Sequence, residues 1–224
     1  MSAYDAISNT KPIAALPVLS FPLPSPGLAL VTYPVTGADA PESLLRLFYK
    51  IFSDELESGC TYPQEGPMTY EAFLAYFFAA TTIVGIITKV GSQGEIDTSG
   101  DLESAKAGRS WEECVGGCYY IKPNYPGRSS HVRTRNAGFI VPTHHRGKKI
   151  GLALGKSYLE YAPKLGYRGS VFNLVYKNNI SSLAIWDQLG FTRVGIIPNA
   201  GRLKTGPSGV EEYVDAVIIH KNFV

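Results

Sequence analysis

The sequence is poor in the residues that build disulfide frameworks and metal centres. It contains three cysteines, Cys60, Cys114 and Cys118, which cannot all pair with one another. No CxxC motif occurs, and no second pair of potential ligands lies near Cys114 and Cys118. We therefore expect reduced cysteines, no structural zinc or other metal, and a cytoplasmic setting.

An excess of charge of one sign is also absent. The 21 lysines and arginines nearly balance the 19 aspartates and glutamates, so the formal net charge is +2 at pH 7. A general nucleic-acid-binding protein would need a basic face, and we expect no nucleic-acid partner. Apolar residues make up 45% of the 224 residues, which excludes a disordered chain.

No stretch predicts a membrane span or a secretory signal. Residues 72–88 carry no charge, but they fall short of the roughly 20 residues that a spanning helix needs. Their first half favours helix and their β-branched second half favours strand, so we expect a buried helix followed by a buried strand. Residues 1–26 include Asp5 and five prolines and predict an extended arm. A single domain is expected over residues 27–224.

Predicted strands and helices alternate along the chain, which indicates an α/β fold. An amphipathic helix should begin after Pro41 and end at Gly59, with Leu44, Phe48 and Phe52 on its apolar stripe. Residues 91–110 are polar and predict an exposed loop. Later strands are expected at 113–122, 136–141, 170–176, 191–197 and 211–220, and later helices up to about residue 165 and over 181–189.

The segment HRGKKIG, residues 145–151, joins a predicted strand to a predicted helix. Free N–H groups in the first turn of a helix, with glycines nearby, favour binding of an anion such as a phosphate. The Walker A pattern and the GxGxxG dinucleotide pattern are both absent. A solvated basic cluster at a helix start is the alternative. We expect His144 and His145 to face solvent beside the phosphate, with a titrating base as the other possibility.

Two motifs resemble those of the GCN5-related N-acetyltransferase superfamily. The acetyl-CoA loop pattern [R/Q]-x-x-G-x-[G/A] matches residues 146–151, with Lys149 in place of the usual middle glycine. A later pattern, N-x-x-A-x-x-x-Y-x-x-x-G-F, matches residues 179–191, with Trp186 in place of tyrosine.

The chain is most similar to the fungal L-azetidine-2-carboxylate N-acetyltransferases, which acetylate proline analogues. ESGCTYPQ (57–64) and YYIKPNYPGR (119–128) are the more specific matches, since they lie outside the superfamily motifs. The loop over residues 128–135 is slightly longer here than in that family. The other matching stretches are NAGFIV (136–141), HRGKKIG (145–151), YLEYAPKLGY (158–167), FNLVY (172–176), IWDQLGF (185–191) and VDAVI (214–218).

The resemblance implies a GNAT fold, with a mixed central sheet of about seven strands, splayed strands four and five, and flanking helices. It also implies that acetyl-CoA is the co-substrate. The implied acetyl-CoA-binding residues are Phe139, Ile140, Val141, Arg146, Gly147, Lys148, Lys149, Ile150, Gly151, Asn173, Leu174, Asn179 and Trp186. A helix N-cap is the alternative role for Asn179.

The same resemblance assigns the acceptor to a second set of residues. Asn136 and Asn173 map onto the two asparagines that handle the substrate, and they are the candidate catalytic residues. Asn136 could instead end a turn, whereas an asparagine inside the apolar strand FNLVY needs polar partners. Phe139, Glu57 and Tyr62 are further candidates for substrate binding, with a structural role at a helix end as the alternative for Glu57 and Tyr62.

The expected activity is transfer of acetyl from acetyl-CoA to the secondary amine of a small imino acid. L-Azetidine-2-carboxylate, cis-4-hydroxyproline and a proline-pathway intermediate such as pyrroline-5-carboxylate or glutamate semialdehyde are candidate acceptors, and the role would be detoxification of proline analogues. Alternatives are a primary amine, polyamine or protein lysine as acceptor, and a non-catalytic acetyl-CoA-binding domain. The family also suggests a homodimer. Because asparagine does not titrate, the motifs contain no evident base.

Overall fold

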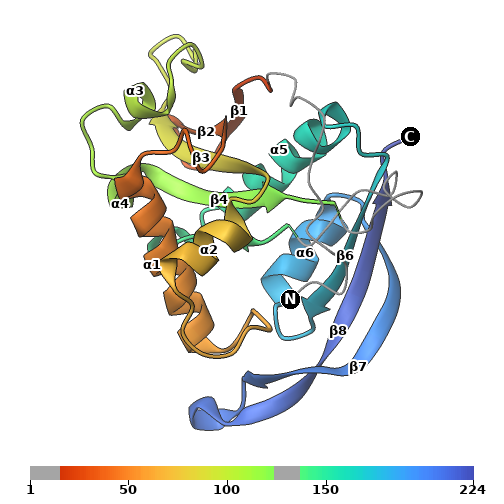
Figure 1. Ribbon diagram of the computed structural model, residues 1–224. Helices are drawn as coiled ribbons and strands as arrows, with labels where there is room; N and C mark the ends of the chain where they lie inside the picture. Colours follow the sequence, from red (N-terminus) through yellow and green to blue (C-terminus); the bar gives the residue numbers. More distant parts are fainter. Residues whose placement is uncertain (1–15, 124–136) are drawn as a thin grey trace.

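The computed structural model describes residues 16–123 and 137–224, and its strands form two sheets (Figure 1). The first sheet has the order β1-β2-β3-β4-β5, and the second has the order β6-β8-β7. All strand pairs between described residues are antiparallel. The strands are β1 (Leu19–Pro22), β2 (Leu28–Val35), β3 (Thr81–Lys89), β4 (Val115–Ile121), β5 (Phe139–Ile140), β6 (Gly169–Tyr176), β7 (Thr192–Lys204) and β8 (Glu211–Asn222).

Helices cover both faces of the first sheet (Figure 1). The α1 and α2 helices pack on one face, where Phe48, Phe52, Phe73 and Phe77 are fully buried. The α5 and α6 helices form the other layer, built on a second buried cluster. The helices are α1 (Glu42–Ser58), α2 (Tyr70–Phe77), α3 (Leu102–Lys106), α4 (Trp111–Cys114), α5 (Ile150–Lys164) and α6 (Ile180–Gln188), with short 3₁₀ turns at Thr143–His145 and Pro207–Gly209.

The expected first helix is confirmed. It follows Pro41, buries its predicted apolar stripe, and ends at Gly59, whose φ of 63° lies in the left-handed region that glycine tolerates. The uncharged stretch 72–88 also has the expected form, because α2 ends at Phe77 and β3 begins at Thr81. Among the described residues, no helix has both the length and the apolarity that crossing a membrane requires.

Two segments are more ordered than the sequence indicated. Residues 16–26, placed in the expected arm, include β1, which pairs with β2 through partners such as Leu19 and Thr32. The expected loop 91–110 contains α3, because the Asp101 side chain caps that helix by accepting from the Ser104 N–H at 2.8 Å. Residues 1–15 lie outside the described residues.

The two sheets separate between β5 and β6. The β5 strand pairs with β4, while β6 pairs with β8, and no ladder joins β5 to β6 among the described residues. The α/β class is therefore confirmed and the expected splay is present. The described strands number eight rather than about seven, because β1 adds an edge. In the part of the chain that the structure describes, the hydrogen bonding is antiparallel throughout rather than mixed, because the separated strands form no parallel ladder there.

Candidate active site

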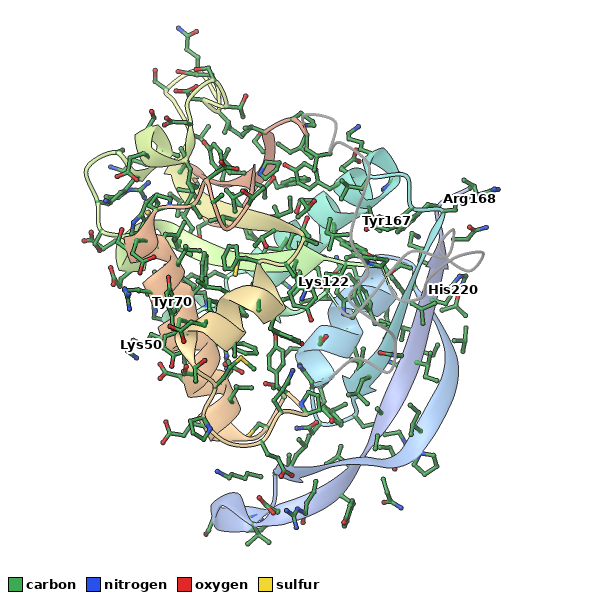
Figure 2. All side chains as sticks on the ribbon, viewed as in Figure 1. Lys50, Tyr70, Lys122, Tyr167, Arg168 and His220 are labelled. Carbon is green, nitrogen blue, oxygen red and sulfur yellow. The ribbon has the colours of Figure 1, made fainter. Side chains whose placement is uncertain are left out.

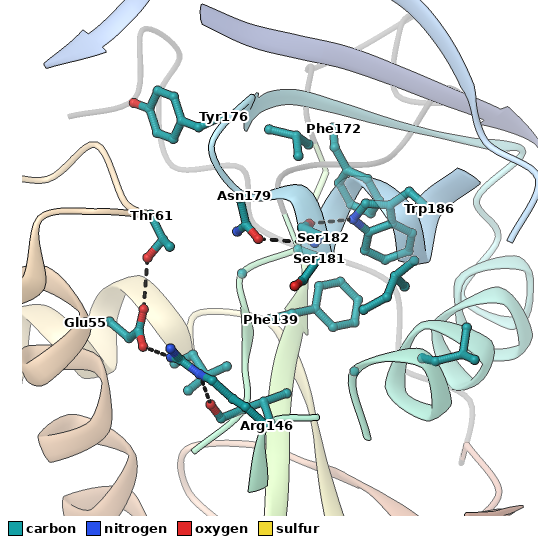
Figure 3. Close-up of a pocket in the computed structure, with 18 of the residues that line it drawn as sticks. Glu55, Thr61, Phe139, Arg146, Phe172, Tyr176, Asn179, Ser181, Ser182 and Trp186 are labelled. Carbon is teal, nitrogen blue, oxygen red and sulfur yellow. Dashed lines mark hydrogen bonds and ion pairs between the residues drawn. The ribbon is translucent and has the colours of Figure 1, made fainter. Parts of the chain in front are cut away.

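A cavity of about 580 Å³ lies where the two sheets separate (Figure 3). Its walls come from α1, α2, β4, β5, the N-terminus of α5, β6 and α6. Most of the predicted cofactor residues meet there, although they span four separate segments of the chain. The predicted residues that line it are Tyr62, Phe139, Ile140, Val141, Arg146, Gly147, Lys149, Ile150, Gly151, Leu174, Asn179 and Trp186, whereas Glu57, Lys148 and Asn173 do not.

The N-terminus of α5 opens onto this cavity with its first N–H groups uncapped. Lys149 occupies the N-cap position without a side-chain cap, at a φ of 61°. A left-handed backbone explains why glycine is usual at this point of the motif, since a side chain there costs about 1 kcal/mol. At Gly147, φ is 79°, and apart from its chain neighbours no atom of the described residues lies within 4 Å of where a Cβ would stand. The turn therefore leaves room for an anion to approach the backbone.

The basic side chains of the turn point in different directions. The Arg146 guanidinium forms an ion pair with Glu55 of α1, and its Nε donates to the Val141 carbonyl at 3.3 Å. The Lys148 Nζ lies 3.3 Å from the Nδ1 of His145. Arg146 thus reaches across the cavity to α1, while Lys148 turns toward the 3₁₀ turn.

His145 is buried, so its expected solvent-facing position is wrong. Its side chain lines the cavity, and its Nε2 has no hydrogen-bond partner among the described residues. Burial lowers the pKa of His145 to about 4, helped by repulsion from His144 and Lys148. The imidazole is therefore neutral at pH 7. His144 is exposed as expected, and its Nε2 lies 3.0 Å from the Glu112 carbonyl oxygen.

Aromatic rings close the cavity at α6. Trp186 is 4% exposed and packs against Phe172 and Phe139, at centroid distances of 4.5 and 5.0 Å. Its Nε1 donates to the Ser182 hydroxyl at 3.1 Å (Figure 3). An indole has this one donor and no usable acid, so Trp186 serves as a packed wall rather than a proton source.

Asn179 both lines the cavity and caps α6. Its side-chain oxygen accepts from the Ser182 N–H at 3.1 Å. The N-cap role is therefore observed, and contact with a cofactor stays a prediction.

Asn173 lies in an irregular part of β6. The register with β8 shifts between Phe172 and Val175, and the neighbours Phe172 and Leu174 line the cavity. The Asn173 Oδ1 is buried and has no hydrogen-bond partner among the described residues. A buried amide oxygen without a partner is rare, and it marks Asn173 as unusual in this strand. Asn136 lies outside the described residues.

The opposite end of the cavity is built from tyrosines and one carboxylate. Tyr62, Tyr76 and Tyr120 line it, and the hydroxyls of Tyr76 and Tyr120 lie 2.9 Å apart. Burial raises the pKa of Tyr62 well above its usual value, so that hydroxyl keeps its proton. The ammonium of Lys122, which is labelled near the centre of Figure 2, lies 4.2 Å from the Tyr120 ring centroid. Glu55 completes this end of the cavity.

Comparisons with known proteins identify the family. No family model matches the chain. It is 42% identical over 188 residues to N-acetyltransferase aca1 of Schizosaccharomyces pombe, covering 84% of each chain. The GCN5-related N-acetyltransferase from Kribbella flavida has the same fold, with a TM-score of 0.63, 23% identity, and coverage of 85% of this chain and 97% of that one. The chain belongs to the family of N-acetyltransferase aca1, and its fold is that of the GCN5-related N-acetyltransferases.

Two further matches extend this picture. The chain is 30% identical over 210 residues to Protein SPT10 of Saccharomyces cerevisiae, and the match covers 82% of this chain but 32% of that protein. The acetyltransferase yncA from Salmonella typhimurium, solved with acetyl-CoA, shares the fold at a TM-score of 0.61 and 14% identity, over 86% of this chain and 94% of that one. The expected GNAT fold and the expected class of enzyme are thus confirmed.

Sequence reasoning missed several cavity residues of this N-acetyltransferase, and among the described ones Glu55 is the charged residue. Its side chain is 14% exposed, whereas the predicted Glu57 is exposed and lies outside the cavity. A signal was present, because Glu55 follows the buried Phe52 by three residues and so flanks the apolar stripe of α1. A carboxylate at the border of a buried stripe, in the last turn of a helix, is a candidate for an interior role.

Proposed function

We propose that this chain transfers an acetyl group from acetyl-CoA to the amine nitrogen of a small molecule. One observation carries the proposal beyond family membership. A single cavity connects the uncapped N-terminus of α5 to the acceptor end at Glu55 and Tyr62. An anionic cofactor and an amine acceptor can therefore approach each other inside one cavity.

The residues of the cavity fit acetyl-CoA. The open turn at Gly147 and the free N–H groups of α5 suit a pyrophosphate. The gap between β5 and β6 suits an extended chain that bonds to the backbone, because β5 pairs only with β4 among the described strands. Acetyl-CoA supplies an activated acetyl group as its thioester.

The chain contributes positioning and polarisation rather than a strong acid. A backbone N–H group on the free edge of β5 would donate to the thioester carbonyl and stabilise the negative charge that develops there. The walls formed by Phe139, Phe172 and Trp186 exclude water from the reacting carbon. The Trp186 N–H donates to the Ser182 hydroxyl, so this side chain would not protonate the departing thiolate.

The acceptor we favour is a small imino acid, such as L-azetidine-2-carboxylate, cis-4-hydroxyproline or a proline-pathway intermediate, and the role we favour is detoxification. ESGCTYPQ and YYIKPNYPGR support this choice, and they contribute Thr61, Tyr62 and Tyr120 to the acceptor end. A cavity of about 580 Å³ suits a small acceptor better than a protein surface does. Asn136 and Asn173 would orient the nitrogen by accepting a hydrogen bond from its N–H, and the proton itself would leave to water. We also propose a cytoplasmic homodimer.

The test is release of CoA by the purified protein with acetyl-CoA and a panel of acceptors. The panel contains azetidine-2-carboxylate, cis-4-hydroxyproline, proline, a polyamine and a lysine peptide. Turnover with the ring imino acids alone supports the proposal in full. Turnover with primary amines alone keeps the enzyme class and discards the acceptor. Bound acetyl-CoA without turnover of any panel member would favour a non-catalytic domain.

A further inference from the structure

The Glu55 carboxylate joins the two ends of the cavity. It comes from the last turn of α1, and its side chain is 14% exposed. The Thr61 hydroxyl donates to its Oε2 at 2.9 Å, and the Arg146 guanidinium pairs with its Oε1 (Figure 3). Thr61 belongs to the acceptor end, whereas Arg146 belongs to the turn before α5. Glu55 therefore contacts both binding regions at once.

Arg146 has competing partners. Its side chain is 52% exposed, so it has room to move. A pyrophosphate at the N-terminus of α5 would offer more negative charge than one carboxylate and the Val141 carbonyl oxygen. A guanidinium drawn to that phosphate leaves Glu55 largely buried without its cation, which is unfavourable until another cation replaces it.

An acceptor amine supplies that replacement. Amines are protonated at neutral pH, and even a neutral amine presents an N–H donor to a carboxylate. Glu55 is the one carboxylate among the described residues that line the cavity. The nearby rings of Tyr76 and Tyr120 already face the Lys122 ammonium, at 4.5 and 4.2 Å. The Arg146 guanidinium and the acceptor nitrogen thus compete for the carboxylate oxygens of Glu55.

We propose that Glu55 binds the acceptor nitrogen and that Arg146 occupies this carboxylate until acetyl-CoA draws the guanidinium away. Acetyl-CoA then prepares the acceptor end, and the two substrates bind cooperatively. The inference rests on the proposed function, since it needs acetyl-CoA at the α5 turn. By linkage, the acceptor must increase the affinity for acetyl-CoA by the same factor as acetyl-CoA increases affinity for the acceptor.

The experiment is a double-mutant cycle on the full chain with Glu55→Gln, Arg146→Gln and the pair together. Calorimetry gives the Kd of acetyl-CoA, and CoA release gives kcat and KM for the acceptor identified by the panel. Asp54→Asn is the matched control, because Asp54 is an exposed neighbour on α1 that pairs with Lys50. We expect this control to leave the Kd, kcat and KM within about twofold of the parent protein.

Glu55→Gln should tighten acetyl-CoA binding by about threefold, because Arg146 no longer has an ion pair to break. In the Arg146→Gln background the same change should leave the Kd of acetyl-CoA unaltered. Glu55→Gln should also raise the acceptor KM by at least about tenfold, which is the effect of losing one charged hydrogen bond. Thr61→Val should raise this KM by a smaller factor of about three, without altering any charge.

Three results would overturn the inference. One is an acceptor kcat/KM within about twofold of the parent protein in Glu55→Gln. Another is an equal change in the Kd of acetyl-CoA in both backgrounds, which would remove the link to Arg146. If Glu55→Gln does not fold, the third is an acceptor KM in Thr61→Val that equals the KM of the parent protein, which would also overturn the inference. All three results leave the proposed function intact. The proposed function fails on a different result, namely that the parent protein does not bind acetyl-CoA.

Discussion

Replacing Asn173 with leucine should stabilise the protein while removing its activity. The Asn173 Oδ1 is buried in β6 and has no hydrogen-bond partner among the described residues. A buried oxygen of this kind costs about 1–3 kcal/mol relative to a satisfied one, and an apolar group of similar shape avoids that cost. The residue as a whole is partly exposed, which places the expected gain at the lower end, about 1 kcal/mol. For a chain of 224 residues this gain corresponds to a Tm increase of roughly 2–4 °C.

The activity should move in the opposite direction. If the amide oxygen accepts the acceptor's N–H, its loss should lower kcat/KM by at least about tenfold, or about 1.4 kcal/mol of transition-state stabilisation. Thermal unfolding followed by circular dichroism measures the first effect, and CoA release measures the second. Calorimetry with acetyl-CoA, on Asn173→Leu and on the smaller Asn173→Ala, separates loss of transfer from loss of cofactor binding.

Thr81→Val is the matched control for Asn173→Leu. The Thr81 hydroxyl oxygen is also buried without a partner among the described residues. Neither residue lines the cavity itself, but Asn173 lies between Phe172 and Leu174, which do, whereas Thr81 begins β3 in the other sheet. The control should raise the Tm by a similar amount and keep kcat/KM within about twofold. The reasoning is refuted if Asn173→Leu lowers stability by more than about 1 kcal/mol, which would reveal a structural hydrogen bond. Full activity in Asn173→Leu would refute the role in transfer.

Three further predictions concern the walls and supports of the cavity. Trp186→Tyr should keep kcat within about tenfold of the parent value, since the indole N–H donates to Ser182 and gives no proton to the thiolate. A larger loss in steady-state assays would show that tyrosine cannot replace tryptophan in this wall. Gly117→Ala should lower the free energy of unfolding by about 2 kcal/mol or more and also lower activity. The new methyl group would overlap the Ile140 carbonyl oxygen and push β5 away from β4. Denaturant titration measures the change in stability, and an unchanged midpoint would contradict the prediction. His145→Gln should reduce the loss of stability in acid. The pKa of His145 falls from 6.5 in the unfolded chain to about 4 in the folded one, so the unfolded state binds the extra proton and the free energy of unfolding drops by roughly 1–3 kcal/mol as pH falls across this range. Denaturant titrations from pH 7 to pH 4 should show a smaller drop in the variant, and equal drops would contradict the prediction.

Parts of the site could be predicted because their signals are local. The turn before α5 is one example, where a strand, glycines and a helix start occur within a few residues of each other. The left-handed φ at Lys149 agrees with the glycine that the superfamily motif places there. The cap at Asn179 follows from an asparagine placed directly before a helix, and its bond to Ser182 spans three residues. Motifs of this kind determine backbone geometry over one or two turns, and sequence reasoning captures them well.

Other parts could not be predicted because they depend on how distant elements pack. The burial of His145 is one example, since HHR looks polar in sequence and its neighbour His144 is exposed. The side chain is enclosed because its 3₁₀ turn borders the cavity. Glu57 and Glu55 are another example. The two carboxylates are two residues apart on α1 and therefore point to different sides of the helix, so Glu57 is exposed while Glu55 lines the cavity. The apolar stripe of α1 does not indicate which flanking residues the cavity reaches.

The sequence by itself determined the layered α/β arrangement, the first helix, the change from α2 to β3, and the glycine-containing turn before α5. Each depends on apolar periodicity, capping residues or turn residues that act between near neighbours. Only the tertiary structure placed Glu55 against Arg146, a pair separated by 91 residues. It also left the Asn173 oxygen without a partner among the described residues. Such contacts depend on the docking of whole elements across the gap between two sheets, and no local pattern specifies that distance.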